Sequence, residues 1–328
     1  MSMAEERLDE QPVRRVHVRA PGKVNLFLGV GDLDEDGYHE LSTVFQAVSL
    51  YEDVIATPAD RFSIAVTGVA DPSGVPLDDR NLAIRAAKVL AAATGYEGGV
   101  HLDVHKSVPV AGGMGGGSAD AAAALVACNE LWRTGLDHGR LHELAARLGA
   151  DVPFALLGGT AVGSGRGDVL TPALSRGRYE WVLVLDDEGL STPAVYRAFD
   201  LAMAEELRSD RAAPARRRAG DPVQVPPSFF ESLLSGEAFE LGRSLRNQLE
   251  AGSFRLRPAL KDLIDEVVGD ASGPVAAGIV SGSGPTVAFL CGSAAEADST
   301  AERLRGRGRT ALRAHGPVRG AHVLAVDV

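Results

Sequence analysis

Cysteine is almost missing from this sequence, which contains only Cys128 and Cys291 among its 328 residues. Two thiols are too few for a disulfide framework, and neither has a metal-ligating neighbour at a useful spacing. The sequence therefore predicts a protein of a reducing compartment, the cytoplasm, without a metal site built from its side chains.

Long apolar runs and an excess of basic charge are also missing. No apolar stretch is long enough to cross a bilayer, and the polar start MSMAEERLDEQPVRR lacks the apolar run of a signal peptide. The chain has 33 Lys and Arg against 44 Asp and Glu, a net charge of −11. Such a chain is a poor nonspecific partner for nucleic acids or anionic membranes. We expect neither as a partner, and we predict that residues 1–13 form a mobile extension.

The chain is long enough for two domains. Its 328 residues exceed the comfortable size of one core. Strand-like and helix-like segments are mixed without regular βαβ alternation, which favours an α+β fold over a doubly wound sheet. We predict an N-terminal domain of residues 14–166 and a C-terminal domain of residues 167–328. Within the second domain, the Arg-, Pro- and Ala-rich stretch 208–227 is predicted to be a mobile surface loop.

Strand-like patterns occur on both sides of one proline. Val16–Ala20 and Val24–Val30 predict two strands that Pro21 and Gly22 interrupt. Further along, residues 160–170 (TAVGSGRGDVL) are interpreted as one strand-like stretch.

The most informative stretch is PVAGGMGGGSADAA, residues 109–122, which stands between an alternating strand and an alanine-rich helix. Glycines let an anion approach the backbone, and a helix start offers unpaired N–H groups and the positive end of the macrodipole. No lysine follows these glycines as in a P-loop, and the dinucleotide fingerprint fails in every register. A merely tight connection is the alternative, but so many glycines together favour phosphate binding. Ser118 is a candidate N-cap or phosphate contact, and Asp120 should point away from the phosphate.

Three ordered stretches resemble the GHMP kinases, a family named for galactokinase, homoserine kinase, mevalonate kinase and phosphomevalonate kinase. They are APGKVNLFL (residues 20–28), the glycine loop and GIVSGSGPTVAF (residues 278–289). Two more, DGYHELSTVFQAVSLYED (residues 36–53) and GADVPF (residues 149–154), resemble those members whose acceptor carries a cytidine diphosphate group. A serine hydrolase built on Ser118 is remote, because the G-x-S-x-G elbow is missing.

The resemblance implies a two-domain GHMP architecture with the active site in the cleft between the domains. It implies an ATP-dependent kinase that phosphorylates a hydroxyl of a small cytidine diphosphate compound, as a monomer or a weak homodimer. Ala119 stands where the family often has a second serine that helps to hold magnesium, so Mg²⁺ is expected to be carried on the nucleotide phosphates. A homoserine- or mevalonate-type kinase and a non-catalytic nucleotide-binding regulator of this fold stay open as alternatives.

The resemblance also implies roles for particular residues. From the sequence alone, Asp151, two residues before Pro153, is a candidate helix N-cap and Lys23 a surface lysine. The resemblance makes them the catalytic pair, because a transferred phosphoryl group needs a carboxylate near the attacking hydroxyl and a cation beside it. On the nucleotide side we expect Pro109, Ala111, Gly112, Gly113, Gly115, Gly116, Gly117 and Ser118, with Asn81 and Lys106 near the adenine or the phosphates.

The acceptor side depends on aromatic residues. The resemblance implies that Tyr38 and Tyr196 form a sandwich about the cytosine and that His39 reads its hydrogen-bonding edge. Taken singly, the three residues are better explained as packing or surface residues, but together, after an Asp-Gly turn, they favour binding. Asn25 is expected to bind the substrate or to steady the catalytic carboxylate. Gly282 and Ser283 are expected to close a backbone turn on the site, although a tight hairpin explains them nearly as well.

Overall fold

The computed structural model describes residues 14–34, 37–68, 74–186, 188–209, 224–271 and 273–327. The predicted extension 1–13 lies outside the described residues, as does most of the predicted loop 208–227. Both expectations therefore stay predictions. At the edges of that loop, Ser209 is the last residue of helix α5 (Thr192–Ser209) and Pro227 is the first of helix α6 (Pro227–Ser235).

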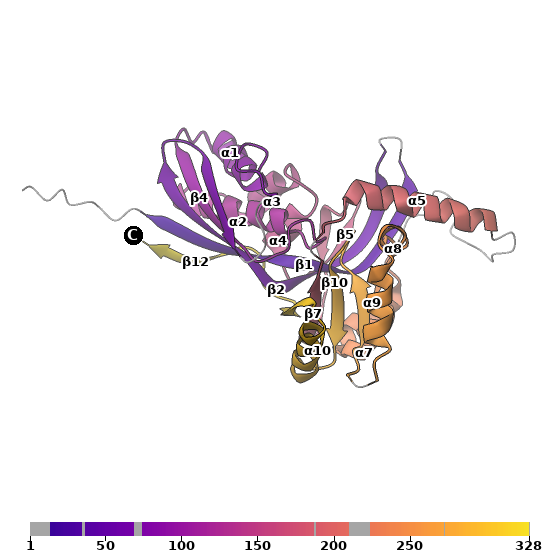
Figure 1. The fold of residues 1–328 in the computed structure, drawn as a ribbon. Helices are drawn as coiled ribbons and strands as arrows, with labels where there is room; N and C mark the ends of the chain where they lie inside the picture. The colour runs from indigo at the N-terminus through magenta and orange to yellow at the C-terminus, as the bar shows by residue number, and fades with distance from the viewer. Residues whose placement is uncertain are drawn as a thin grey trace, which may run out of the picture.

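Two long strands, β1 (Arg15–Leu33) and β2 (His39–Ala59), form the centre of the larger of two sheets (Figure 1). The order is β12-β1-β2-β4-β3, with β5 and β6 added next to β2 and β8 next to β1. Strand β1 pairs with β12 near its start and with β8 further along, and β2 pairs with β5 and then with β4. The two long strands therefore connect different parts of the molecule. The other strands of this sheet are β3 (Ser63–Gly68), β4 (Gly99–Lys106), β5 (Thr160–Ser164), β6 (Val169–Pro172), β8 (Arg246–Asn247) and β12 (His322–Asp327).

Two local predictions were wrong in opposite ways: one predicted break in a strand is absent, and one predicted continuous strand is interrupted. Pro21 and Gly22 do not end a strand: β1 runs through them, and a shift in its register with β2 falls between these two residues. Such an irregularity tolerates the missing N–H of proline. The stretch 160–170 is two strands, not one, because Gly165 (φ 69°) and Gly167 (φ 88°) turn the chain between β5 and β6.

Four helices cover one face of the larger sheet (Figure 1). The central one is α2, in which Ala119 and the alanines that follow it are fully buried. Small side chains let this helix pack closely against β1, β2 and α1 at once. The glycine loop thus opens onto a helix that is fixed on every side. The four helices are α1 (Leu82–Thr94), α2 (Gly116–Leu131), α3 (His138–Ala146) and α4 (Val152–Leu157).

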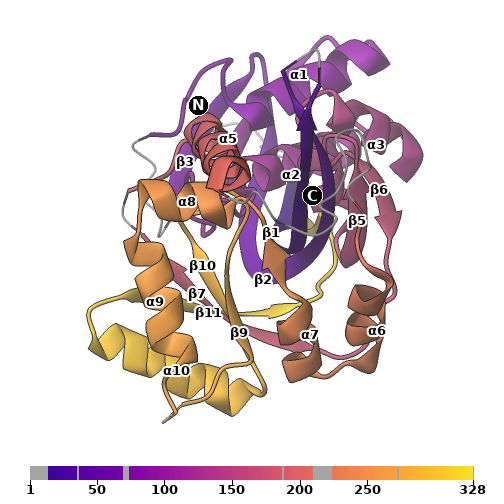
Figure 2. The ribbon, with the colours of Figure 1, turned by 90° about the vertical axis from the view of Figure 1, so that its right-hand side faces the viewer.

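The smaller sheet has the order β11-β7-β10-β9. Figure 2 shows α9 (Ala259–Val268) and α10 (Ala294–Gly306) on its outer side, where they close a separate core. Its other face packs against the middle of β1 and β2, and there Trp181 Nε1 donates to Gln46 Oε1 at 3.0 Å. The remaining elements are β7 (Tyr179–Leu185), β9 (Ala277–Val280), β10 (Val287–Cys291), β11 (Thr310–Gly316), α7 (Ala238–Ser244) and α8 (Glu250–Leu256).

The α+β fold is confirmed, but the sheets do not follow the predicted division after residue 166. That position falls in the turn of the β5–β6 hairpin, and both of its strands belong to the larger sheet. The last strand, β12, also returns to the larger sheet and pairs with the start of β1. The domain boundary itself therefore stays a prediction.

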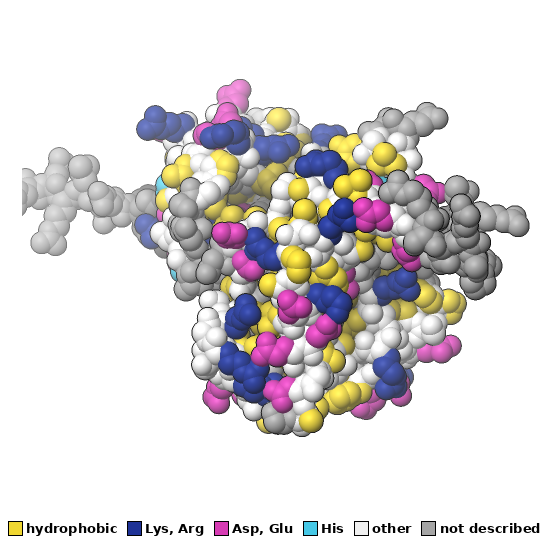
Figure 3. Space-filling view, turned by 45° about the vertical axis from the view of Figure 1, so that its right-hand side comes forward, with side chains coloured by type: hydrophobic (Ala, Val, Ile, Leu, Met, Phe, Trp, Pro, Cys, Tyr) yellow, Lys and Arg dark blue, Asp and Glu magenta, His cyan; other side chains and the backbone are white. Residues whose placement is uncertain are grey.

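One face of the described surface carries charges of both signs. On the face shown in Figure 3, basic and acidic side chains are interspersed among the described residues. In the part of the chain that the structure describes, none of the helices combines the length and apolar character needed to cross a bilayer.

Candidate active site

The glycine loop lies between β4 and the start of α2 and forms the wall of a cavity of about 540 Å³. Gly113 (φ 78°) and Gly115 (φ 72°) have backbone conformations that side chains disfavour. At Gly113 a Cβ atom would also lie 2.1 Å from the Ser281 carbonyl oxygen. Gly115 is the N-cap of α2 and has no side chain to cap it, so the first N–H groups of the helix are available to a ligand. Ser118 is therefore inside the helix and is not its cap.

Every residue predicted for the nucleotide side lines this one cavity. Asn81 and Lys106 do so with their polar atoms already paired. Asn81 caps α1, since its Oδ1 accepts from Ala83 N at 2.8 Å while its Nδ2 donates to the Pro76 carbonyl. Oδ1 and Nδ2 each use one of two possible hydrogen bonds, so a contact with a nucleotide is compatible with the cap. The remaining lining residues from the prediction are Pro109, Ala111, Gly112, Gly113, Gly115, Gly116, Gly117 and Ser118.

A buried ion cluster lies behind the loop. Lys106 Nζ donates to Glu52 Oε1 at 2.8 Å and to Asp120 Oδ2 at 2.6 Å, and all three side chains are at most 5% exposed. Burial, with the nearby Asp120 charge, raises the pKa of Glu52 to about 8. Asp120 thus points into the protein and toward a lysine, as its predicted orientation away from the phosphate requires. Because Asp120 belongs to α2 and Lys106 to β4, the cluster fixes the two elements on either side of the loop.

Lys23 and Asp151 meet beside the same loop. Lys23 Nζ lies 4.0 Å from Asp151 Oδ2 and donates to Asn25 Oδ1 at 2.6 Å and to the Gly113 carbonyl at 2.7 Å. Burial lowers the pKa of the Lys23 ammonium, and the Asp151 carboxylate opposes that change. Lys23 is therefore no surface lysine. Asp151 precedes α4 as its N-cap residue, but its side chain makes no capping hydrogen bond and is 34% exposed.

Asn25 accepts a hydrogen bond from Lys23 and is itself fixed by two further hydrogen bonds. Its Nδ2 donates to Thr43 Oγ1 at 2.9 Å, and that hydroxyl donates in turn to the Phe27 carbonyl at 2.8 Å. The chain of bonds fixes the amide so that its oxygen faces the ammonium group. The contact is with Lys23 and not with the Asp151 carboxylate, so both predicted roles of Asn25, binding the substrate and steadying that carboxylate, stay predictions.

A second cavity, of about 410 Å³, contains Lys23 and Asp151 together. It shares Gly113, Gly115 and Ser118 with the loop cavity, so the two spaces meet at the glycine loop. We call it the acceptor cavity. Its other lining residues include the predicted Asn25, Tyr196, Gly282 and Ser283, and the unpredicted Thr43, Arg166 and Thr192.

The loop that follows β9 closes the acceptor cavity from the side of the smaller sheet. Gly282 (φ 58°) lies so close that a Cβ atom there would be 3.1 Å from Lys23 Nζ. Ser283 Oγ and Thr192 Oγ1 share a hydrogen bond of 2.9 Å. Behind the loop, the buried Asn247 Nδ2 donates to the Val280 and Gly282 carbonyls. The predicted backbone turn is thus present and is fixed by a residue that the sequence did not indicate.

The three aromatic residues gather at the start of β2, in an arrangement that differs from the expected sandwich. The ring that lies against Tyr196 is His39, with centroids 5.4 Å apart and planes 19° apart. Tyr38 is 54% exposed, and the Arg166 guanidinium carbon lies 3.8 Å from its ring centroid. Burial and the charge of Asp151 raise the pKa of Tyr196 to about 12, so its hydroxyl stays protonated.

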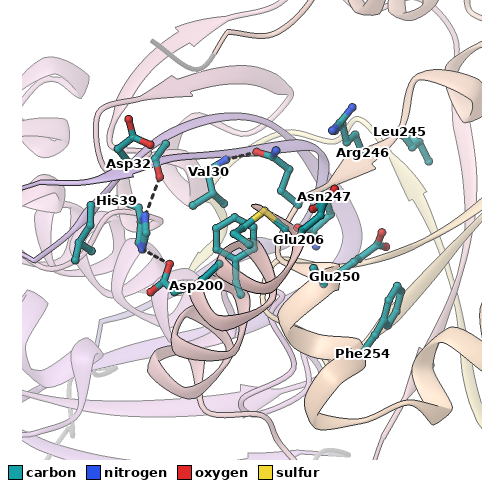
Figure 4. A pocket seen from close by; sticks show the side chains of 17 residues that line it. Val30, Asp32, His39, Asp200, Glu206, Leu245, Arg246, Asn247, Glu250 and Phe254 are labelled. Atoms are coloured by element: carbon teal, nitrogen blue, oxygen red, sulfur yellow. Dashed lines mark hydrogen bonds and ion pairs between the residues drawn. The ribbon is translucent and has the colours of Figure 1, made fainter. Parts of the chain in front are cut away.

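His39 faces a third cavity, of about 1030 Å³, which Figure 4 shows. Its Nδ1 lies 2.8 Å from the Gly31 carbonyl, and its Nε2 lies 3.3 Å from Asp200 Oδ1. The Nδ1 is thus paired with a backbone carbonyl, whereas the Nε2 is buried near Asp200 without a hydrogen-bond partner among the described residues. Reading of a base edge by His39 would require its ring to turn, and that role stays a prediction.

Some residues of the site carried no recognised signal in the sequence. Glu52 and Asn247 resemble ordinary surface residues until the fold buries them. Arg166 did have a signal, its position between two glycines in SGRGD, but this stretch was interpreted as part of a strand.

The carriage of Mg²⁺ on the nucleotide phosphates stays a prediction. In the described ranges, no group of three or more His, Cys, Asp or Glu side chains is arranged to hold a metal ion. Asp120, the carboxylate nearest in sequence to the glycine loop, is bound to Lys106. A cation that enters here with a polyphosphate would find Ser118 among the lining residues.

Models of one kinase family match both halves of the chain. The model described as "GHMP kinases N terminal domain" matches residues 81–159, which include the glycine loop and Asp151. The model described as "GHMP kinases C terminal" matches residues 229–310, which include the loop at Gly282.

Proteins named 4-diphosphocytidyl-2-C-methyl-D-erythritol kinase are similar over nearly the whole chain. The one from Leifsonia xyli subsp. xyli is 50% identical over 311 residues, 94% of this chain and 99% of that protein. The one from Arthrobacter sp. is 50% identical over 319 residues, 95% of this chain and 96% of that protein. A crystal structure of a 4-(cytidine 5'-diphospho)-2C-methyl-D-erythritol kinase is 33% identical, with a TM-score of 0.69, and covers 91% of this chain and 98% of that one. A homoserine kinase from Cytophaga hutchinsonii, 17% identical with a TM-score of 0.68 and 99% of each chain covered, shows the fold alone.

The fold and the two matched domains define the class of the GHMP kinases, enzymes that use ATP to phosphorylate small molecules. Within this class, the chain belongs to the 4-diphosphocytidyl-2-C-methyl-D-erythritol kinase family, because relatives of that name share half of its residues along nearly its full length. The resemblance that the sequence motifs indicated is thereby confirmed.

Proposed function

We propose that the protein transfers the γ-phosphoryl group of ATP to the 2-hydroxyl of 4-diphosphocytidyl-2-C-methyl-D-erythritol, a step toward isoprenoid precursors outside the mevalonate route. The observation that carries the proposal is the Lys23–Asp151 pair at 4.0 Å, in a cavity that meets the glycine loop. The relatives at 50% identity support the choice of acceptor.

The nucleotide phosphates bind at the glycine loop. Unpaired N–H groups at the start of α2 donate to the phosphate oxygens, and the bare backbone at Gly115, Gly116 and Gly117 permits close approach. Mg²⁺ bound to the phosphates supplies further neutralisation of their charge when the nucleotide is present. The predicted role of Ser118 as a phosphate contact belongs to this proposal.

In the transfer step, the oxygen of the acceptor hydroxyl bonds to the γ-phosphorus of ATP as the bond from that phosphorus to the β–γ bridging oxygen breaks. Asp151 accepts a hydrogen bond from the hydroxyl, orients it and takes its proton. Lys23 holds the Asp151 carboxylate in place and stabilises the charge on the transferred group. The products are ADP and the 2-phosphate ester.

The base of the acceptor binds near the aromatic residues at the start of β2. Tyr38 and Tyr196 provide rings on which cytosine stacks, and His39 supplies a polar edge after its ring has turned. Stacking tolerates any base, so selectivity for cytosine depends on the polar contacts. Small acceptors such as homoserine or mevalonate have no base and would leave this region unused.

An ADP-coupled assay with three acceptors tests the proposal. The cytidine substrate should be phosphorylated, while homoserine and mevalonate should give rates near background. Turnover of mevalonate without turnover of the cytidine compound would identify a kinase with another acceptor. ATP binding without turnover of any of the three acceptors would favour a non-catalytic regulator. The oligomeric state, monomer or weak homodimer, is a separate prediction that size-exclusion chromatography with light scattering can check.

A further inference from the structure

The tip of the β5–β6 hairpin is fixed to the strand that begins the base site. Gly167 N donates to the Ser164 carbonyl at 3.0 Å, which closes the turn. Leu41 N, near the start of β2, donates to the Gly165 carbonyl at 2.8 Å. Arg166 lies between these bonds, and its own N–H donates to Asp168 Oδ1 at 3.3 Å. The backbone of Arg166 is therefore held next to the start of β2.

The side chain of Arg166 reaches both parts of the site. Its guanidinium carbon lies 3.8 Å from the centroid of the Tyr38 ring, well within the range of a cation–π contact. The same residue lines the acceptor cavity with Lys23 and Asp151. Arg166 thus both contacts Tyr38 and belongs to the wall of the cavity that contains Lys23 and Asp151.

Side chains of both charges line the acceptor cavity. Among its described lining residues, the basic side chains are Lys23 and Arg166 and the acidic one is Asp151. Lys23 already donates to Asn25 and to the Gly113 carbonyl, and its nearest charge is Asp151. A diphosphate entering this cavity requires a cation of its own, because burying unpaired charge is costly.

We propose that Arg166 binds the diphosphate of the acceptor and sets its distance from the base. This inference rests on the proposed function, which supplies an acceptor with a base, a diphosphate and a hydroxyl in that order. A guanidinium is a planar fork that donates two parallel hydrogen bonds to phosphate oxygens, which a lysine cannot do. Contact with the Tyr38 ring fixes the guanidinium where the diphosphate passes from the base site to the transfer site.

Steady-state kinetics with the Arg166→Gln variant tests the inference. The KM for the cytidine acceptor should rise about 10- to 100-fold, the size of one lost charge-assisted interaction, with kcat and the KM for ATP within about threefold of the wild type. Arg166→Lys should recover part of the loss, because it restores the charge but not the fork. Arg140→Gln is the matched control: this exposed arginine pairs with Glu143 on α3, away from the site, and its variant should behave as the wild type.

Inhibitor binding separates the role of charge from that of packing. Wild-type protein should bind CDP more tightly than cytidine, and Arg166→Gln should lose most of that difference while cytidine affinity changes less than threefold. An unchanged preference for CDP, or an unchanged KM, would overturn the role of Arg166 and leave the proposed function intact. If the wild type neither turns over the cytidine acceptor nor binds CDP, the proposed function fails, and the inference fails with it.

Discussion

Lys23 Nζ lies 4.0 Å from Asp151 Oδ2, although one residue belongs to β1 and the other precedes α4. The glycine loop holds Lys23 in this position, since Lys23 N donates to the Met114 carbonyl and Lys23 Nζ donates to the Gly113 carbonyl. The position of the charged pair is therefore coupled to the conformation of the loop that would bind the nucleotide.

We predict that Asp151→Asn lowers kcat by about 10²- to 10⁴-fold, the usual contribution of a positioned acid–base group. The amide has nearly the same shape, and the Asp151 side chain makes no capping bond, so the fold and ATP binding should persist. Coupled kinetics and nucleotide titration measure the two quantities. Asp103→Asn, at an exposed position of β4, is the control. Near-normal turnover of Asp151→Asn would remove this carboxylate from the reaction.

Gly113→Ala should both destabilise the protein and raise the KM for ATP. The added Cβ would lie 2.1 Å from the Ser281 carbonyl oxygen at a φ of 78°, so the glycine loop must move. Gly95→Ala isolates the backbone strain, because Gly95 has a φ of 69° and open space around its Cβ position. Urea unfolding should show a loss of about 1 kcal/mol for Gly95→Ala and a larger loss for Gly113→Ala. Equal losses would show that the contact with Ser281 has no energetic effect.

The ion cluster behind the loop gives a prediction about stability. Lys106→Met would leave the buried carboxylates of Glu52 and Asp120 facing each other without a cation. We expect a loss of about 3–5 kcal/mol in the free energy of unfolding. Lys88→Met breaks the more exposed pair with Asp79 and should cost at most about 1 kcal/mol. Denaturant titration of both variants measures the difference, and similar losses would contradict a special role for the cluster.

Glu250 gives a prediction about pH. Burial raises the pKa of Glu250 from 4.5 to about 7, against a hydrogen bond from Val280 N. Between these two values the native state binds more protons than the unfolded state, so this group makes stability fall as pH rises from about 4.5 to about 7. Glu250→Gln keeps an acceptor for Val280 N and removes the titration. In urea titrations, the free energy of unfolding of the variant should therefore rise relative to that of the wild type as the pH goes from 5 to 8. A difference that does not change with pH would refute the shifted pKa.

The sequence was sufficient for the fold class and for the residues that surround the glycine loop. The glycine cluster indicated this loop, because positions with a positive φ or a close backbone approach, such as Gly113 and Gly115, require glycine. Asp151 was different: the pattern before Pro153 predicted a cap as readily as a catalytic group, and only the family resemblance separated the two.

Other parts of the site could not be predicted because long-range packing determines them. Glu52, Lys106 and Asp120 come from three separate elements, and nothing local indicates that one lysine will satisfy two carboxylates. The position of His39 against Tyr196 depends on how α5 lies across the start of β2. The β5–β6 turn could have been predicted from the two glycines that flank Arg166. The apolar alternation on both sides of them suggested a continuous strand instead.

The return of β12 to the larger sheet limits how this chain can be divided. β12 follows the second matched kinase segment, yet it pairs with β1 from Arg15↔Asp327 to Arg19↔His322. A fragment that stopped after β11 would leave the backbone of β1 as an open strand edge, which invites intermolecular pairing and aggregation. Such a fragment is thus expected to aggregate when it is expressed without β12. A circular permutant that joins the neighbouring ends of β12 and β1, with new termini in an exposed loop, should still fold.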